Sequence, residues 1–89
     1  MVIGKVAGTI VATKKSENLI GMKFLIVQKY DIDGKPTKDY VVALDSVGAG
    51  ADEMVMVCSG SSARLTDVTK NKPTDATIVG IIDTIQMKK

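Results

Sequence analysis

The chain has 89 residues, which is room for one domain, and we expect a single domain over residues 1–89. Its formal net charge of +2 is too small to indicate binding to nucleic acid or a membrane. The chain contains no histidine and a single cysteine, Cys58, which excludes an internal disulfide and a zinc site of the Cys/His type. Because so short a chain buries a modest core, association with another chain is the expected source of additional stability.

Five segments rich in valine and isoleucine predict strands. In chain order they are residues 2–13, 22–30, 39–45, 53–59 and 77–87. No window is long and apolar enough for a membrane span, so we expect a soluble, cytoplasmic protein.

The links between these segments are of the kinds that strands require. A polar loop follows the first strand, and Asp33-Gly34 followed by Pro36 predicts a hairpin turn over residues 31–37. The sequence GSSAR, residues 60–64, predicts one short helix, with Ser61 or Ser62 as its N-cap. A proline-containing connector, residues 69–75, leads to the last strand. The expected fold class is therefore all-β: a small, mostly antiparallel, five-stranded OB-like β-barrel with one short helix before the last strand.

Glycines interrupt two of the predicted strands, at Gly4, Gly8 and Gly80. A glycine weakens a strand unless the backbone bends sharply there or passes close to another chain segment. Closing a small barrel requires tight curvature, so we interpret these glycines as structural.

Several predicted strands are apolar on both faces, although a strand in a small monomeric barrel should alternate apolar and polar residues. These two-sided runs are FLIV, VVAL, MVMV and IVGII, at residues 24–27, 41–44, 54–57 and 78–82. A sheet buried on both faces in so short a chain needs an external partner. The most economical partner is another copy of the same chain.

The residues needed for catalysis are missing. Without histidine the commonest general base is absent, the serines of GSSAR have no histidine to activate them, and the spacing does not indicate a Ser–Lys pair. Cys58 lies in an apolar strand, where a thiol is usually a small core residue. The segment 31–39 resembles a calcium loop only superficially, because Gly34 is its fourth residue rather than its sixth. We therefore predict no enzyme activity, no cofactor and no metal.

The stretch SVGAGADE, residues 46–53, could be taken for a phosphate-binding loop. Such a loop needs a helix after it, whose N-terminus faces the phosphate, but here a strand follows. Its glycines are better explained by positive φ or a close backbone approach.

A single-stranded nucleic-acid-binding module is the alternative function, because OB-like barrels often serve it. That binding requires aromatic platforms and a basic groove. The chain offers only Phe24, Tyr30 and Tyr40 as aromatic residues, and Arg64 is its only arginine. The alternative is therefore weakly supported.

Three motifs in this order, DSVGAGADE, SGSSAR and PTDATIVGIID, together with the opening GKVAGTIVAT, resemble the EutN/CcmL family. The resemblance covers essentially the whole chain. It implies a small β-barrel that forms homopentamers, caps the vertices of a bacterial microcompartment beside hexameric shell proteins, and is located in that cytoplasmic shell. No nucleic acid or membrane is among the implied partners.

The resemblance also implies where protomers meet. It places two segments near the seam between protomers or near the central opening of the ring. Their residues are Ser46, Val47, Gly48, Ala49, Gly50, Asp52, Glu53, Ser61, Ser62 and Arg64. Asp75, Gly80 and Asp83 fall in the C-terminal motif of the family.

Two of these residues carry specific expectations. The family usually has glycine where this chain has Asp52, so a positive φ there would have to be tolerated by an aspartate. For Arg64 we expect a contact with an acidic residue or backbone carbonyls of a neighbouring protomer, because a guanidinium suits such contacts better than an ammonium group.

Overall fold

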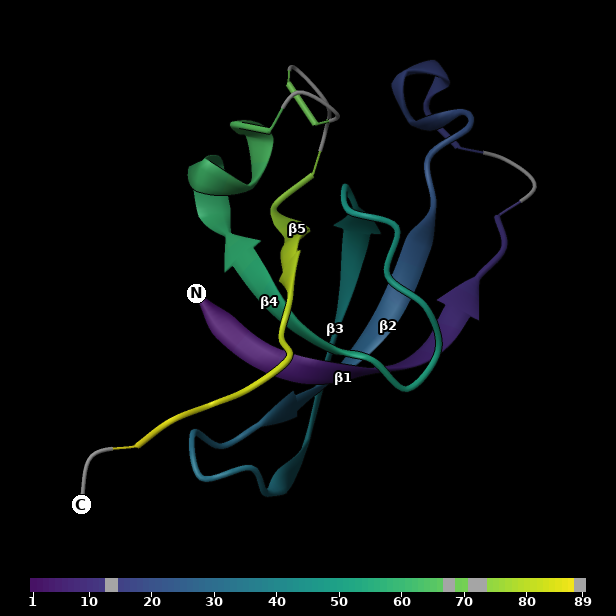
Figure 1. Ribbon diagram of the computed structural model, residues 1–89. Coiled ribbons are helices and arrows are strands. Elements are labelled where there is room, and N and C mark those ends of the chain that lie inside the picture. Colours follow the sequence, from purple (N-terminus) through teal and green to yellow (C-terminus); the bar gives the residue numbers. More distant parts are fainter. Residues whose placement is uncertain (13–14, 67–68, 71–73, 88–89) are drawn as a thin grey trace.

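The computed structural model describes residues 1–12, 15–66, 69–70 and 74–87, and shows a closed five-stranded barrel (Figure 1). Its strands are β1 (Val2–Ile10), β2 (Phe24–Tyr30), β3 (Pro36–Asp45), β4 (Met54–Ser59) and β5 (Ala76–Ile81). The 3-10 helix η2 (Gly60–Arg64) precedes β5, which confirms the predicted all-β barrel with one short helix before the last strand. A second 3-10 helix, η1 (Glu17–Leu19), was not expected.

The strands follow one another around the barrel in the order β1-β2-β3-β5-β4. Four of the neighbouring pairs are antiparallel, and β3 pairs with β5 in parallel through Leu44 opposite Thr77 and Asp45 opposite Ile78. This short parallel contact closes the barrel, so no strand is left as a free edge. The predicted, mostly antiparallel arrangement is thereby confirmed.

Three predicted boundaries are wrong. Pro36 opens β3 rather than lying in the turn, since the first residue of a strand can do without an N–H donor. The last strand ends at Ile81 rather than at residue 87, because β4 begins at Met54 and offers no backbone beyond the Ile82 N–H to Met54 O bond. The N-cap of η2 is Ser59, not Ser61 or Ser62, and its side chain makes no capping bond.

Other predictions are only partly covered by the described residues. The first strand ends at Ile10, and residue 13 of the predicted segment lies outside the described residues. Residues 71–73 of the predicted connector lie outside them as well. Among the described residues, no helix combines the length and the apolar character needed to cross a membrane.

The core is filled by alternate residues of β1, β2 and β4 and by consecutive residues near the end of β3 and the start of β5. Val27, Val55 and Ile78 are fully buried, and Leu25 and Val57 are 1% exposed. Residues on the other face of the two-sided runs remain partly open: Val42 is 49% exposed and Met56 is 36% exposed. One chain therefore leaves part of its apolar strand surface exposed, as the patterning predicted.

Close backbone approach explains Gly4, and local bending explains Gly8. A Cβ atom at position 4 would collide with the backbone carbonyl of Gln28 and lie 2.6 Å from Val27 Cγ1. Gly8 follows a shift in the β1–β2 register after Val6, the signature of a β-bulge. The structural interpretation is confirmed at Gly4, where a side chain is excluded, whereas Gly8 lies beside the bulge but has room for a Cβ atom.

Candidate functional site

The glycine-rich turn, residues 45–53, joins β3 to β4 and is organised by its own carboxylates. Asp45 Oδ1 accepts hydrogen bonds from the backbone N–H groups of Val47 (3.0 Å) and Gly48 (3.1 Å). Gly48 takes φ = 76°, a conformation that costs glycine little. Further along, Glu53 Oε1 accepts a 2.6 Å bond from the N–H of Gly50. The amides that would have to cradle a phosphate therefore already bind carboxylates of the same chain.

Lys23 ties the glycine-rich turn to the barrel. Its Nζ donates a 2.9 Å hydrogen bond to the carbonyl oxygen of Ala49 and lies 3.8 Å from Asp45 Oδ2. The Asp45 side chain is only 3% exposed, so the lysine supplies a positive charge where water has little access. Ala49 itself is fully buried and belongs to the core cluster. The turn is thus a rigid part of the barrel wall.

Asp52 has the positive φ that the comparison with the family pattern anticipated, at 66°, the only such non-glycine value among the described residues. Hydrogen bonds with β1 hold it there: the Asp52 N–H donates to Val6 O (3.0 Å), and the Val6 N–H donates to Glu53 O (2.9 Å). Its side chain is 83% exposed and lies 3.9 Å from the Lys5 ammonium group. The backbone strain is thus imposed by pairing with β1.

The helix η2 is anchored by buried threonines. The carbonyl oxygen of Ala63 accepts bonds from Thr69 Oγ1 (2.7 Å) and Thr77 Oγ1 (2.6 Å). All three residues are fully buried. Ser61, Ser62 and Arg64 lie on the exposed side of the same short helix. The network fixes the inner side of η2 and leaves its outer side free for contacts.

Strand β5 connects the two candidate segments. Ser46 Oγ donates a 2.7 Å bond to the carbonyl oxygen of Ile78, and the adjacent Thr77 reaches Ala63 in η2. No hydrogen bond or ion pair between described residues joins the two segments directly. Within one chain they are therefore held by the same strand without forming a common pocket.

The predicted interface residues divide into two groups. Ala49 is buried, and Ser46 and Gly50 are half-buried with their polar groups bonded within the chain. The others are exposed: Val47, Gly48, Asp52, Glu53, Ser61, Ser62 and Arg64. The second group is available to a neighbour, whereas the first fixes the shape of the turn.

Reasoning from the sequence did not identify Lys23, Thr69 or Thr77 as organisers of these segments. A single lysine before a strand and scattered threonines carry no periodic signal, and their partners lie 26, 6 and 14 residues away. Within the described part of the chain, no cluster of three His, Cys, Asp or Glu side chains could hold a metal ion.

Comparison with known proteins gives consistent matches. The family described as "Ethanolamine utilisation protein EutN/carboxysome" matches residues 1–83. The carboxysome shell vertex protein CcmL of Gloeobacter violaceus is 45% identical over 98% of this chain and 87% of its own length. Its solved structure gives a TM-score of 0.93, covering 98% of this chain and 90% of that one.

Two relatives from other microcompartments match as well. The bacterial microcompartment shell vertex protein PduN of Salmonella typhimurium is 44% identical, covering 96% of this chain and 98% of its own. The structure of GrpN, a pentameric microcompartment shell protein from Rhodospirillum rubrum, covers 100% of both chains with 42% identity and a TM-score of 0.88.

Proposed function

Because the chain belongs to the EutN/CcmL family of microcompartment shell vertex proteins, we propose that five copies close into a ring that caps a vertex beside hexameric shell proteins. The chain is a structural shell protein and not an enzyme, as its missing catalytic groups predicted. Nothing in the comparisons supports the alternative function of a single-stranded nucleic-acid-binding module.

The likeness to a pentameric relative over the full length carries this proposal. GrpN matches every part of the chain, including the residues after β5 that leave the barrel. In a single chain, apolar residues on the outer face such as Val42 and Met56 are exposed, and a neighbouring chain would cover them. A ring needs a heterologous contact, in which two different surfaces of each protomer meet.

The exposed members of the candidate segments are proposed to lie at or near this contact. Val47, Asp52 and Glu53 project from a turn that Lys23 and Asp45 hold rigid. A surface fixed before assembly loses little conformational entropy when a neighbour binds. The buried Ala49 contributes indirectly, by setting the position of the turn.

Arg64 is proposed to contact the neighbouring protomer. Its side chain is exposed at the end of η2, and none of the ion pairs between described residues involves it. We expect Arg64→Ala to weaken the ring without unfolding the protomer, because no described contact within the chain depends on the guanidinium group. Native mass spectrometry over a dilution series measures the stability of the ring. A variant that keeps the same oligomer as the unchanged chain at low concentration would contradict a contact between Arg64 and the neighbouring protomer.

Native mass and sedimentation test the proposed function most directly. Five copies of the 9.4 kDa chain give a particle of about 47 kDa. Addition of this chain to extended sheets of a hexameric shell protein should convert the sheets into closed polyhedra, because five-membered tiles introduce curvature. A monomer that binds oligonucleotides at low salt would overturn the proposal.

A further inference from the structure

A groove lies between the N-terminus, the β2–β3 hairpin and the C-terminal arm (residues 82–87), and part of it borders β1 and β4. Three adjoining hollows form it, with volumes of about 280 to 420 Å³. Tyr30 lines the first and second, Ile32 the first and third, and Gly34 the second and third. These shared residues show that the hollows form one surface, which we call the hairpin groove.

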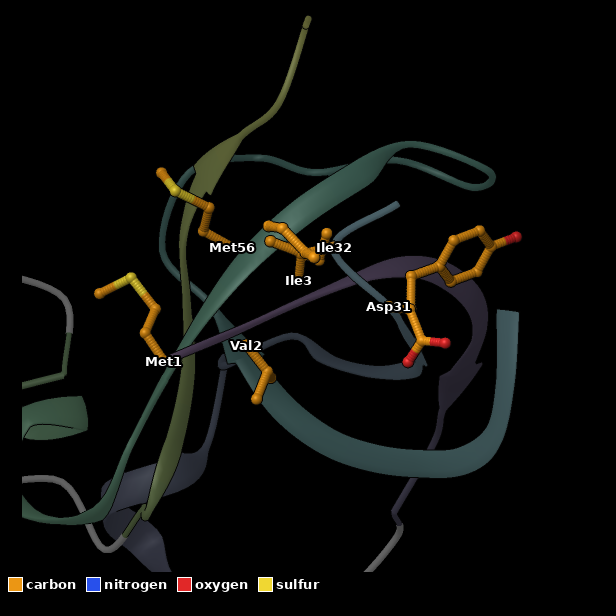
Figure 2. A pocket seen from close by; sticks show the side chains of 7 residues that line it. Met1, Val2, Ile3, Asp31, Ile32 and Met56 are labelled. Carbon is orange, nitrogen blue, oxygen red and sulfur yellow. The ribbon is translucent and has the colours of Figure 1, made fainter. Parts of the chain in front are cut away.

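The floor of the hairpin groove is apolar. Figure 2 shows Ile3 and Ile32 together in the first hollow, with Met1 and Met56 to one side. Met1 is 74% exposed and Ile32 60% exposed, so a single chain leaves this surface largely open to water. Covering such a surface is favourable, and methionine side chains adapt readily to the shape of a partner.

The rim of the hairpin groove is acidic. Four aspartates line the three hollows, namely Asp31, Asp33, Asp52 and Asp83, and Lys5 is the only cationic side chain among the lining residues. Lys5 lies 3.9 Å from Asp52 and offsets part of that charge. A partner that fits this groove should therefore present an apolar side chain with positive charge beside it.

The chain carries a surface of that kind at the far end of the barrel. Leu65, directly after η2, is 82% exposed, and the preceding Arg64 is exposed as well. Lys70, whose N–H bonds to the carbonyl oxygen of Thr66, is a second exposed cation at this end of the barrel. We call Arg64, Leu65 and Lys70 the η2 knob. Figure 1 shows η2 at the end of the barrel opposite the β2–β3 hairpin.

We propose that the η2 knob of one protomer inserts into the hairpin groove of the next, with Leu65 on its apolar floor and Arg64 facing its acidic rim. This inference rests on the proposed ring and names the two surfaces that meet in it. Two different, complementary surfaces of one chain form a head-to-tail contact, which gives a closed ring when the rotation between protomers closes. The buried threonine network behind η2 keeps the knob rigid for this contact.

Site-directed cross-linking tests the proposed contact. In a Cys58→Ala background, Leu65→Cys and Ile32→Cys on the same chain would place one thiol in the knob and one in the groove. Both positions are largely exposed, so the fold should tolerate the changes. A short bismaleimide should then give a ladder of covalent species up to five chains on a denaturing gel. Either cysteine alone should leave the chains unlinked, because the knob does not meet a second knob.

A matched control replaces Leu65→Cys by Ile20→Cys, at a position that is 66% exposed and follows η1. That pair should give no ladder above background. Native mass of the unlinked variants separates the possible failures. Absence of a ring would contradict the proposed function, whereas an intact ring that gives no ladder, or a ladder equal to that of the control, would overturn the knob-in-groove contact alone.

Discussion

Substitution of Gly4 by alanine is expected to destabilise the barrel strongly. The added Cβ would collide with the Gln28 carbonyl and approach Val27 Cγ1 to 2.6 Å. Strand β1 cannot move away, because Gly4 is paired with Lys29 of β2 on one side and Val55 of β4 on the other. Overpacking of this kind costs about 2 kcal/mol. For a domain of this size that lowers the melting temperature by roughly 8–16 °C.

Gly8→Ala in the same strand is the matched control. There the nearest atom to an added Cβ is Ile26 Cδ1 at 3.4 Å, the flexible end of a side chain. We expect unchanged stability or a gain of about 0.5 kcal/mol, because alanine restricts the unfolded chain. Urea denaturation followed by circular dichroism, at one fixed protomer concentration, measures both variants. Equal losses in the two variants, or no loss for Gly4→Ala, would refute the close-packing argument.

Three further sets of substitutions probe the candidate segments. Asp52→Gly should change the free energy of unfolding by less than about 1 kcal/mol, whereas Asp52→Val should lower it by about 1–2 kcal/mol, because a β-branched residue tolerates φ = 66° poorly. Equal melting temperatures of the two variants would show that the turn relaxes. Lys23→Met should lower the free energy of unfolding by about 1 kcal/mol and increase hydrogen exchange in the glycine-rich turn, since Asp45 loses its neighbouring cation. Unchanged hydrogen exchange would show that Lys23 does not hold the turn against the barrel. Thr77→Val should lower the free energy of unfolding by about 1 kcal/mol, measured by thermal denaturation, because Thr69 still donates a hydrogen bond to Ala63 O. The Thr69→Val, Thr77→Val double variant should lose more, and an equal loss would argue against two independent bonds.

The hydrogen-bond partners of several polar side chains could not be predicted from the sequence. Lys23 and Thr77 are ordinary residues for strand ends, and nothing near them in the sequence identifies their partners. The bonds of Lys23 to Ala49 and of Thr77 to Ala63 exist because barrel closure brings distant backbone segments together, whereas Asp45 bonds to Gly48 within its own turn. The Lys23 contact follows the pairing of β2 with β3, and the Thr77 contact follows the pairing of β4 with β5.

Local rules also misplaced the ends of elements. The apolar pattern continues beyond Ile81, so periodicity extended the last strand to residue 87. A strand lasts only as long as a neighbour supplies hydrogen bonds, and β4 supplies none beyond Met54. The residues that follow became the C-terminal arm, which lines the hairpin groove together with Ile32 and Gly34.

The sequence by itself determined the fold class, the turn at Asp33-Gly34 and the surplus of apolar strand surface. Each of these follows from local residue chemistry and from the two-residue period of a strand. Only the tertiary structure decided which apolar residues remain outside and which charges surround them. The acidic rim of the hairpin groove gathers Asp31, Asp52 and Asp83 from separate parts of the chain. Their proximity is a product of barrel closure, because electrostatic and packing complementarity depend on distance in space and not on separation along the sequence.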